Sequence, residues 1–306
     1  MYDYSGLEKQ LRGLDLNRSG LGKRLGISSR TIAKIAKGEK LSRKVLERIA
    51  GFLGVAPGDL YEEKSDNPLL QVLREEKSAG ISGGIYHELQ VRLTYNSNHI
   101  EGSQLTESQT RLIFETNTVG LDEAISVDDI LETVHHFRAI DYCIDHAEEP
   151  LTADFIKELH RILKHDTTAS RLGWFAVGDY KTRPNVVGGR ETTPPRDVAG
   201  EMRKLLEWYG TLPSANIHDI IAFHGRFERI HPFQDGNGRV GRLIAFWQCL
   251  AEGIVPFLID DSKKRFYYRG LANWDEETVW LTDTCLDGQD TMRAILEAFD
   301  IPMGDE

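Results

Sequence analysis

Cysteine is scarce in this chain and forms no motif. The three cysteines, Cys143, Cys249 and Cys285, lie far apart and include no CxxC pair. This excludes a disulfide framework and a cysteine-built zinc site, and it suits a reducing compartment. With 10 prolines and 28 glycines in 306 residues, the chain is neither a collagen-like fibre nor a disordered segment rich in these residues. Its 40% hydrophobic and 28% charged residues are typical of a globular protein of about two domains.

Long apolar runs and a secretory leader are lacking as well. Residues 1–6 carry neither a basic leader nor an apolar stretch. The most apolar segment, 243–259, is interrupted by Gln248 and Glu252 and falls short of a membrane span. We therefore expect a cytoplasmic protein that does not enter a membrane.

The charge is distributed unevenly along the chain. Residues 1–60 hold 12 Lys and Arg against 6 Asp and Glu, a net charge of +6. Because the whole chain carries −11, the other 246 residues carry −17. A basic domain joined to an acidic domain is most simply explained if the basic domain binds phosphate groups. The polar stretch 62–68 predicts a boundary, and we expect a first domain over 1–62, a linker over 63–80 and a second domain over 81–306.

The first domain has apolar residues at helical spacing, with a turn at Gly26-Ile27 and a helix cap at Ser28 or Ser29. The segments GLGKRLGISSRTIAKIAKGE and LSRKVLERIAGFLGVAPGDLYE resemble the Cro/C1-type helix-turn-helix family. The resemblance implies that the second helix of the motif enters the major groove of DNA. The side chains it would bring near DNA are Ser29, Arg30, Lys34 and Lys37. A helical docking domain whose lysines only face solvent is the alternative.

Residues 231–242, with the sequence HPFQDGNGRVGR, gather a histidine, an aspartate, three glycines and two arginines. Apolar spacing predicts a helix before this segment and a second helix after it, so the segment contains a loop. Gly236 and Gly238 allow the backbone to approach a ligand closely. The free N–H groups at the start of the second helix suit a phosphate.

The side chains of this segment point to phosphate chemistry. Arg239 and Arg242 lie three apart on one face of the helix and can grip phosphate oxygens in pairs. Asp235 is a hard ligand for Mg²⁺, and His231 can accept a proton near neutral pH. These residues predict transfer of a phosphate-containing group to a hydroxyl. The glycines also satisfy a dinucleotide-binding fingerprint, but that fingerprint must follow a β-strand, and residues 222–230 have helical spacing.

The same segment matches the Fic family motif HxFx(D/E)GNGRxxR without a departure. The chain thus resembles the Fic proteins, which usually transfer AMP from ATP to a Ser, Thr or Tyr hydroxyl of a protein. The resemblance implies that His231 is the base that activates the target hydroxyl and that Asp235 holds Mg²⁺. It assigns the ATP phosphates to Gly236, Asn237, Gly238, Arg239 and Arg242. Gly238 also departs from the AxKR pattern of the Doc-type kinases, which disfavours a Doc-like phosphoryl transfer.

The flanking segments fit the same family. Residues 178–195 hold two short extended runs around Gly188-Gly189, which predicts a surface hairpin. This hairpin resembles the Fic flap, which implies that Asn185, Val186 and Val187 align a target segment as an added strand. A plain surface loop is the alternative. Residues 265–271 resemble the family's adenine-enclosing segment, with Tyr267 or Tyr268 as the stacking side chain or as ordinary core.

An upstream segment resembles the inhibitory-helix motif of the family, (S/T)xxxE(G/N). It comprises Ser97, Glu101 and Gly102 at the end of a helix expected over about 89–102. The resemblance implies that Glu101 pairs with Arg242 and blocks productive binding of ATP. An exposed carboxylate at a helix end is the alternative. Four histidines at 135, 136, 160 and 165 lack the spacing of a zinc set, and we interpret them as structural or surface residues.

Together these observations predict a mainly α protein. We expect a Fic-type helical bundle with a short β-hairpin flap and a small N-terminal helix-turn-helix domain. The resemblance implies an autoinhibited, Mg²⁺- and ATP-dependent protein adenylyltransferase that modifies another protein or itself. Two alternatives stay open: a DNA-binding regulator whose Fic domain senses nucleotide or modifies the chain, and a Fic enzyme that uses another nucleotide or removes AMP. Association with further copies of the chain stays open too.

Overall fold

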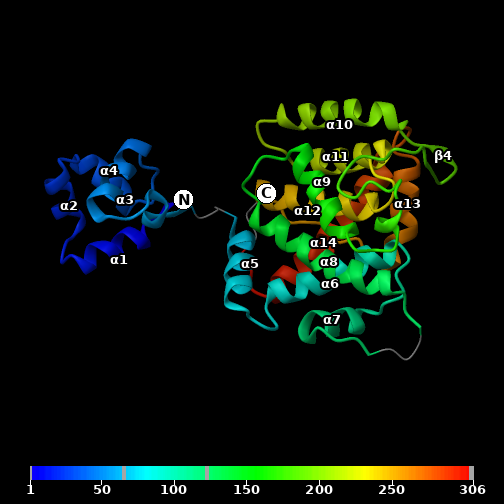
Figure 1. Ribbon diagram of the computed structural model, residues 1–306, viewed down its shortest axis with the longest axis horizontal. Coiled ribbons are helices and arrows are strands. Elements are labelled where there is room, and N and C mark those ends of the chain that lie inside the picture. Colours follow the sequence, from blue (N-terminus) through cyan, green and yellow to red (C-terminus); the bar gives the residue numbers. More distant parts are fainter. Residues whose placement is uncertain (1, 64–66, 121–123, 303–306) are drawn as a thin grey trace. The chain divides into compact units, whose positions relative to one another are not determined.

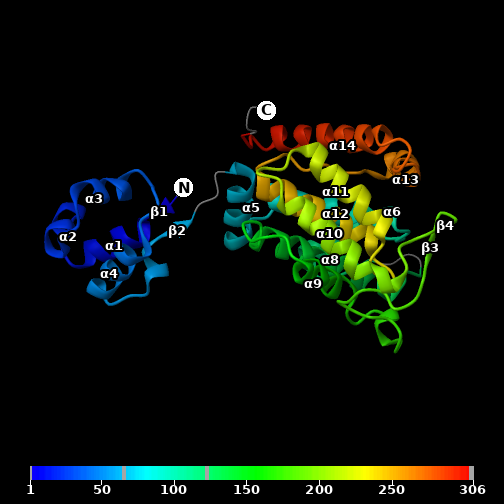
Figure 2. The ribbon, with the colours of Figure 1, turned by 90° about the horizontal axis from the view of Figure 1, so that it is seen from above.

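The computed structural model describes residues 2–63, 67–120 and 124–302. It is mainly helical, which confirms the predicted fold class (Figures 1 and 2). The chain divides into two compact units, residues 1–66 and 67–306. Within the described ranges, no helix combines the length and apolar character that crossing a membrane requires.

The first unit is a small helical domain closed by a two-stranded ribbon. Its elements are β1 (Tyr2–Asp3), α1 (Ser5–Gly13), α2 (Arg18–Leu25), α3 (Ser29–Ala36), α4 (Arg43–Leu53), the 3₁₀ turn η1 (Pro57–Leu60) and β2 (Glu62–Glu63), which pairs antiparallel with β1. Gly26 ends α2 with φ +56°, and the Ser28 hydroxyl caps α3 by accepting the N–H of Thr31. The tight turn between α2 and α3 therefore follows from these two residues.

The second unit is a bundle of helices with one hairpin. Its elements are α5 (Pro68–Ala79), α6 (Ile85–Ile100), α7 (Glu107–Thr116), α8 (Val127–Asp145), α9 (Ala153–Lys164), η2 (Ala169–Arg171), β3 (Val186–Val187), β4 (Arg190–Glu191), α10 (Pro195–Gly210), α11 (Ile217–Ile230), α12 (Asn237–Glu252), η3 (Asp261–Lys263), α13 (Lys264–Ala272) and α14 (Val279–Ala298). Helix α12 lies inside the bundle, with twelve of its sixteen residues buried. Both views place the hairpin at the end of this unit farthest from α5 (Figures 1 and 2).

The boundary between the units differs from the expected linker over 63–80. The division falls between Asp66 and Asn67, and residues 68–79 form α5. Asn67 caps this helix, and Leu69, Leu70 and Leu73 are buried in the core of the second unit. The charged residues of 74–77 lie on the other face of an amphipathic helix, so polar composition suggested a linker where a helix forms.

The expected hairpin within 178–195 is present. Val186 pairs with Glu191 and Val187 pairs with Arg190 in an antiparallel ribbon. Gly188 and Gly189 join the strands with φ of +56° and +80°, the left-handed conformations that a two-residue type I′ turn requires. Each strand has only two residues, so most of the segment is irregular.

Candidate active site

The predicted loop joins α11 to α12. Helix α11 ends at Ile230, His231 follows with φ +51°, and α12 begins at Asn237. The Asn237 side chain is buried, and it accepts the N–H of Phe233 at 2.8 Å and donates to the Phe233 carbonyl at 2.9 Å. Because both polar ends of this side chain are used inside the loop, Asn237 fixes the shape of the loop, and only its backbone N–H is left to face a phosphate.

His231 lies where the chain turns from α11 into the loop. Its side chain is 15% exposed, and Nδ1 lies 4.0 Å from Glu228 Oε2. Burial, followed by the nearby charge of Lys181, lowers the pKa of His231 to about 4. Burial also raises the pKa of Glu228 to about 8. The imidazole is therefore neutral near pH 7 and can accept a proton, as general-base chemistry requires.

The start of α12 is open toward a ligand. Gly236 precedes the helix with φ +81°, and no side chain of the described residues caps the helix there. The first N–H groups of α12 therefore lack an intrahelical partner and can meet an anion. At Gly238, an added Cβ would lie 2.2 Å from Glu101 Oε1. Glycine at this position thus leaves the space that the Glu101 carboxylate occupies.

Arg242 binds the end of α6. Its NH2 group donates to Glu101 Oε1 at 2.7 Å and to the Ser97 carbonyl at 2.9 Å, and Nε donates to Ser97 Oγ at 3.0 Å. Glu101 is the C-cap of α6, and Gly102 follows with φ +101°. The structure therefore brings Ser97 and Glu101 onto the second arginine of the loop motif, while Gly102 supplies the turn that ends the helix.

Tyr267 and Tyr268 have different surroundings. Tyr267 is fully buried, and its hydroxyl accepts from Arg242 NH1 at 3.3 Å and shares a hydrogen bond of 2.7 Å with His224 Nε2. Tyr268 is 42% exposed, and its hydroxyl donates to the Ile100 carbonyl at 2.8 Å. Of the two adenine-stacking candidates, Tyr268 therefore has the free ring surface, whereas Tyr267 supports Arg242 from within the core.

A cavity of about 620 Å³ joins most of these groups, a volume suited to a nucleotide-sized ligand. Its lining comprises Glu101, Val187, Gly188, Arg190, Glu191, Thr192, Glu228, Arg229, His231, Gly238, Arg242, Tyr267, Tyr268, Leu271 and Ala272. This cavity is thus shared by His231, the start of α12, Arg242 and the hairpin. Asp235, Asn237 and Arg239 are not part of this lining.

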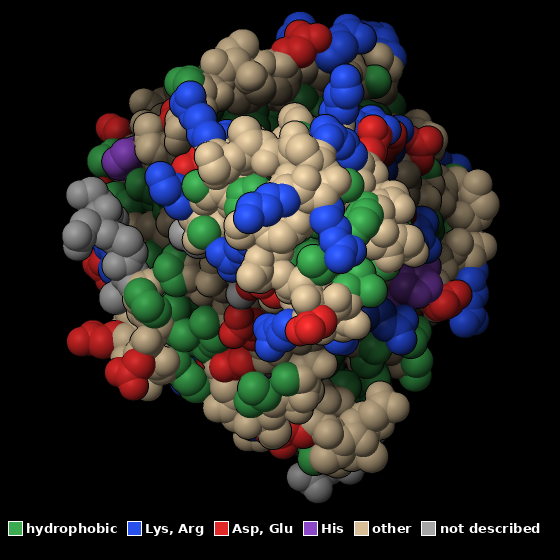
Figure 3. Space-filling view, turned by 90° about the vertical axis from the view of Figure 1, so that its left-hand side faces the viewer, with side chains coloured by type: hydrophobic (Ala, Val, Ile, Leu, Met, Phe, Trp, Pro, Cys, Tyr) green, Lys and Arg blue, Asp and Glu red, His purple; other side chains and the backbone are tan. Residues whose placement is uncertain are grey.

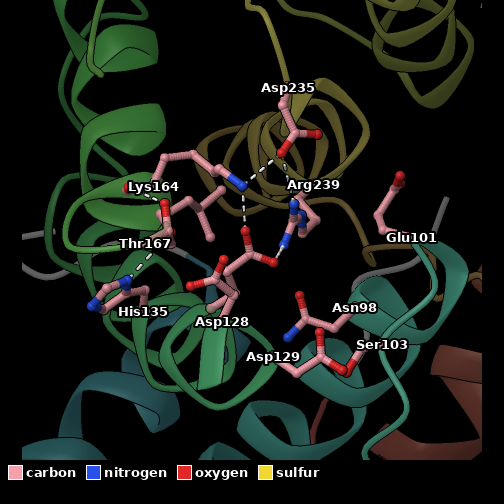
Figure 4. A network of polar contacts seen from close by, with 12 residues as sticks. Asn98, Glu101, Ser103, Asp128, Asp129, His135, Lys164, Thr167, Asp235 and Arg239 are labelled. Atoms are coloured by element: carbon pink, nitrogen blue, oxygen red, sulfur yellow. Dashed lines mark hydrogen bonds and ion pairs between the residues drawn. The ribbon is translucent and has the colours of Figure 1, made fainter. Parts of the chain in front are cut away.

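Asp235 and Arg239 instead belong to a neighbouring ionic network (Figure 4). Lys164 Nζ lies 2.6 Å from Asp235 Oδ2 and also pairs with Glu132, and Glu132 pairs with Arg239 NH1. Arg239 NH2 lies 3.8 Å from Asp235 Oδ2. Burial raises the pKa of Asp235, but Lys164 and Arg239 outweigh it and hold this pKa at about 2. Asp235 is therefore a carboxylate at neutral pH.

The residues at Asp235 fit a metal that arrives with phosphate. Among the residues that the structure describes, no group of three or more His, Cys, Asp or Glu side chains is placed to hold a metal ion. Mg²⁺ is commonly held by one or two carboxylates together with substrate phosphates and water. The Asp235 side chain is 55% exposed, so it fits that mode of binding.

The hairpin is attached to the loop at its base. Lys181 N–H donates to the Pro232 carbonyl at 2.8 Å, and Asn185 Nδ2 donates to the Phe233 carbonyl at 3.3 Å. Lys181 Nζ also donates to Asn185 Oδ1 at 2.8 Å, and burial lowers the pKa of this lysine to about 8. Val186 and Val187 are 62% and 49% exposed. The structure therefore gives Asn185 a supporting contact and leaves the two valines open to solvent.

The four candidate DNA contacts lie on α3 or at its end. Ser29, Arg30 and Lys37 are exposed, and Lys34 is half-buried with Nζ 3.6 Å from Glu39. Figure 3 looks onto the side of Figure 1 where α2 and α3 lie, and Lys and Arg side chains are frequent on the nearest surface. This exposed basic surface is compatible with binding along a phosphate backbone.

Sequence reasoning missed four polar residues around the loop: Glu132, Lys164, Lys181 and Glu228. Only Glu228 carried a usable signal, because it lies three residues before His231 on a helix and so faces the same side. Glu132 and Lys164 sit in helices whose pattern marks only their apolar faces. His160 has structural contacts, since it accepts the Gly178 N–H at 2.9 Å and stacks on Phe233.

Comparisons with known proteins agree with both units. A model described as "Fic/DOC family" matches residues 150–249, and a model of the Cro/C1-type HTH DNA-binding domain matches residues 7–66. Among curated relatives, "Protein adenylyltransferase Fic" of Drosophila willistoni is 30% identical over 183 residues, covering 58% of this chain and 35% of that protein. The protein of the same name from Nematostella vectensis is 28% identical over 182 residues, covering 58% and 41%. The chain thus matches little more than a third of the length of these relatives.

Solved structures support the fold. A Fic domain-containing signaling protein from Bacteroides thetaiotaomicron superposes with a TM-score of 0.59 at 25% identity, covering 78% of this chain and 99% of that chain. Fic-1 from C. elegans superposes with a TM-score of 0.58 at 18% identity, covering 95% and 92%. The second similarity concerns the fold alone.

The surroundings of His231 predict an unusual titration. We expect the imidazole to stay neutral at about pH 6 and to gain its proton only toward about pH 4, because burial and then Lys181 disfavour the charged form. Since the folded protein favours the neutral form, this histidine contributes stability that is complete above about pH 6.5 and is lost as the pH falls toward about 4. The measurement is imidazole NMR of the full chain, with urea-unfolded protein as the control.

The variant Lys181→Met separates the two causes. Removing the lysine charge should raise the His231 midpoint toward the ordinary value of about 6.5 without reaching it, because the burial remains. A wild-type midpoint at or above about pH 6, or a midpoint that Lys181→Met lowers, contradicts this account of the site.

Proposed function

Because the chain carries a Fic/DOC family region and a Cro/C1-type helix-turn-helix domain, we propose that its second unit is a protein adenylyltransferase. The reaction moves AMP from ATP to the hydroxyl of a Ser, Thr or Tyr side chain on a protein. The observation that carries the proposal is the single cavity into which His231, the start of α12 and Arg242 all face. A neutral base, an anion-binding helix terminus and a guanidinium are the groups that transfer of a nucleotide needs.

The chemistry at this site follows from those groups. His231 takes the proton of the target hydroxyl while the oxygen of that hydroxyl forms a bond to the α-phosphorus of ATP. The bond from the α-phosphorus to the bridging oxygen breaks, and pyrophosphate leaves with the electron pair. The N–H groups at the start of α12 and the Arg242 guanidinium stabilise the negative charge of the phosphates. The exposed strand residues Val186 and Val187 offer an edge beside which a target segment can align.

Asp235 is the residue that would hold Mg²⁺. When bound, Mg²⁺ neutralises charge on the phosphates and orients them. Asp235 offers a carboxylate that is ionised and partly exposed beside the start of α12. Tyr268, with its exposed ring on the cavity wall, is the proposed stacking surface for adenine.

We further propose that Glu101 holds the enzyme in an inhibited state. Its carboxylate accepts a hydrogen bond from Arg242 NH2 at 2.7 Å and lies in the space beside Gly238. A triphosphate that needs Arg242 must therefore compete with a carboxylate already bound there. Ser97 adds two further hydrogen bonds to the same guanidinium.

A second candidate function is regulation of transcription through residues 1–62. The match to the Cro/C1-type DNA-binding domain and the exposed basic residues of α3 support it. In this case the second unit senses nucleotide or modifies the chain itself, and both functions reside in one protein.

Loss of the proposed base should remove the activity. We expect His231→Ala to lower AMP transfer about 10²–10⁴-fold with nucleotide binding retained, because the imidazole acts on the hydroxyl and not on the phosphates. Incorporation of label from α-labelled ATP, measured in the Glu101→Gly background, gives the rate, and calorimetry gives the nucleotide affinity. The matched control is His218→Ala, which changes an exposed histidine near the start of α11, the helix that His231 follows. Undiminished transfer by His231→Ala refutes the mechanism.

Removing the inhibitory carboxylate should raise the activity. We expect Glu101→Gly to increase AMP transfer about 5–150-fold, including transfer to the chain itself, because Arg242 becomes free for phosphate. The assay is labelling of a lysate and of the purified protein with α-labelled ATP. Glu107→Gly places the same substitution at a partly exposed position outside the cavity and should leave the rate unchanged. Equal rates for Glu101→Gly and wild type dismiss the inhibition.

DNA binding through α3 is testable separately. We expect Arg30→Ala to weaken binding of the full chain to duplex DNA and to reduce the slope of log affinity against log salt by about 0.9, because one phosphate contact is lost. Gel shifts over a range of salt concentrations give both quantities. Arg43→Ala on α4, where the side chain is 93% exposed, is the control. Unchanged binding by Arg30→Ala, or by a chain without residues 1–62, rules out this surface.

A further inference from the structure

Four charged side chains from three helices and the loop form one network below the start of α12. They are Asp235 in the loop, Lys164 at the end of α9, Glu132 on α8 and Arg239 on α12. Lys164 hydrogen-bonds both carboxylates, whereas Arg239 hydrogen-bonds Glu132 and forms only an ion pair with Asp235 at 3.8 Å. Figure 4 shows the Lys164 and Arg239 side chains both directed toward the Asp235 carboxylate.

Burial in this network is uneven. The side chains of Lys164, Arg239 and Glu132 are 4%, 6% and 14% exposed, whereas Asp235 is 55% exposed. Buried charges are tolerated only when they are paired, and here two cations balance two carboxylates. The three buried members carry one net positive charge, which the more exposed Asp235 carboxylate neutralises.

The network engages both terminal nitrogens of Arg239. One of its terminal nitrogens is held by Glu132, the other faces Asp235, and the residue takes no part in the cavity lining. Arg242, three residues later, faces the cavity and Glu101. The two arginines of the motif therefore have different contacts. Arg239 pairs with Glu132 and with Asp235 of the loop, whereas Arg242 faces the cavity.

The network also determines the net charge around Asp235, and hence how strongly this site attracts a cation. A divalent ion on the exposed side of this carboxylate approaches the Lys164 ammonium, which already neutralises Asp235 at 2.6 Å. The four side chains sum to zero charge, so they offer a free metal ion little net attraction. A triphosphate brings several negative charges of its own and reverses this balance.

We propose that Lys164 and Glu132 are positioning residues for Asp235, and that the Lys164 ammonium keeps free divalent cations off Asp235 until a triphosphate arrives with them. The inference rests on the proposed function, since it concerns the metal that accompanies ATP. The proposal gives Lys164 and Glu132, which lie outside the loop motif, a role in selecting the metal. The site thereby discriminates the metal–nucleotide complex from the metal alone.

Manganese alone is the probe, and the full chain without nucleotide is the sample. We expect Lys164→Met and Lys164→Gln to bind Mn²⁺ about tenfold more tightly than wild type, because Asp235 and Glu132 then face only one cation. Lys164→Arg keeps the charge and should bind as weakly as wild type. Titrations followed by electron paramagnetic resonance count free Mn²⁺ directly and require no catalytic activity.

Three controls assign the effect. Lys204→Met removes a 69% exposed lysine from α10 and should leave Mn²⁺ binding unchanged. Adding Asp235→Asn to Lys164→Gln should abolish the gained site. Thermal unfolding checks the fold, and Lys164→Gln, whose amide can still bond both carboxylates, decides the matter if Lys164→Met does not fold.

The inference is overturned if the folded neutral variant binds Mn²⁺ no more tightly than wild type, or if Lys164→Arg gains the same affinity as the neutral variants. It is also overturned if the gained site survives Asp235→Asn. These outcomes are independent of AMP transfer. A protein that shows the Mn²⁺ pattern but transfers no AMP would refute the proposed function alone.

Discussion

The Arg242 guanidinium is the group on which the polar interior of the second unit depends. It is buried in the middle of a helical bundle, where an unpaired charge would be strongly destabilising. Ser97 and Glu101 satisfy it from α6, and Tyr267 satisfies it from α13. Tyr267 is held in turn by His224 on α11. One cation thus connects four helices, and any ligand that uses it must replace contacts that the fold itself requires.

The same cation links the end of α6 to the wall of the cavity. Glu101 lies at the C-terminus of α6, where the last carbonyl groups have no intrahelical partner. Tyr268 and Lys264 supply donors to these carbonyls, at Ile100 and His99. Helix α13 therefore lines the cavity and also holds the end of α6 that carries Glu101.

The sequence could predict those parts of the site whose residues lie close together along the chain. The loop at 231–242 and the hairpin at Gly188-Gly189 follow from short motifs, and the structure has both of them. The pairing of Glu101 with Arg242, which lie 141 residues apart, is implied only by the family resemblance, and the structure has this contact too. The sequence could not predict Glu132 and Lys164, because their partners lie 107 and 71 residues away and no motif or family resemblance connects them. Helical periodicity tells which face is apolar, but it does not tell which helices will meet at their polar edges.

The spacing of Arg239 and Arg242 predicts that they share a helix face, but it does not predict that they have different partners. Residues three apart on an α-helix lie on one face, but their directions still differ by about 60° because each residue turns the helix by about 100°. That difference directs Arg239 toward α8 and α9 and Arg242 toward α6 and the cavity. Arg239 meets Glu132 and Asp235, whereas Arg242 meets Glu101, and only the pair at Arg242 borders the cavity. A phosphate therefore needs to displace only Glu101, while the pair at Arg239 can stay intact and hold the loop.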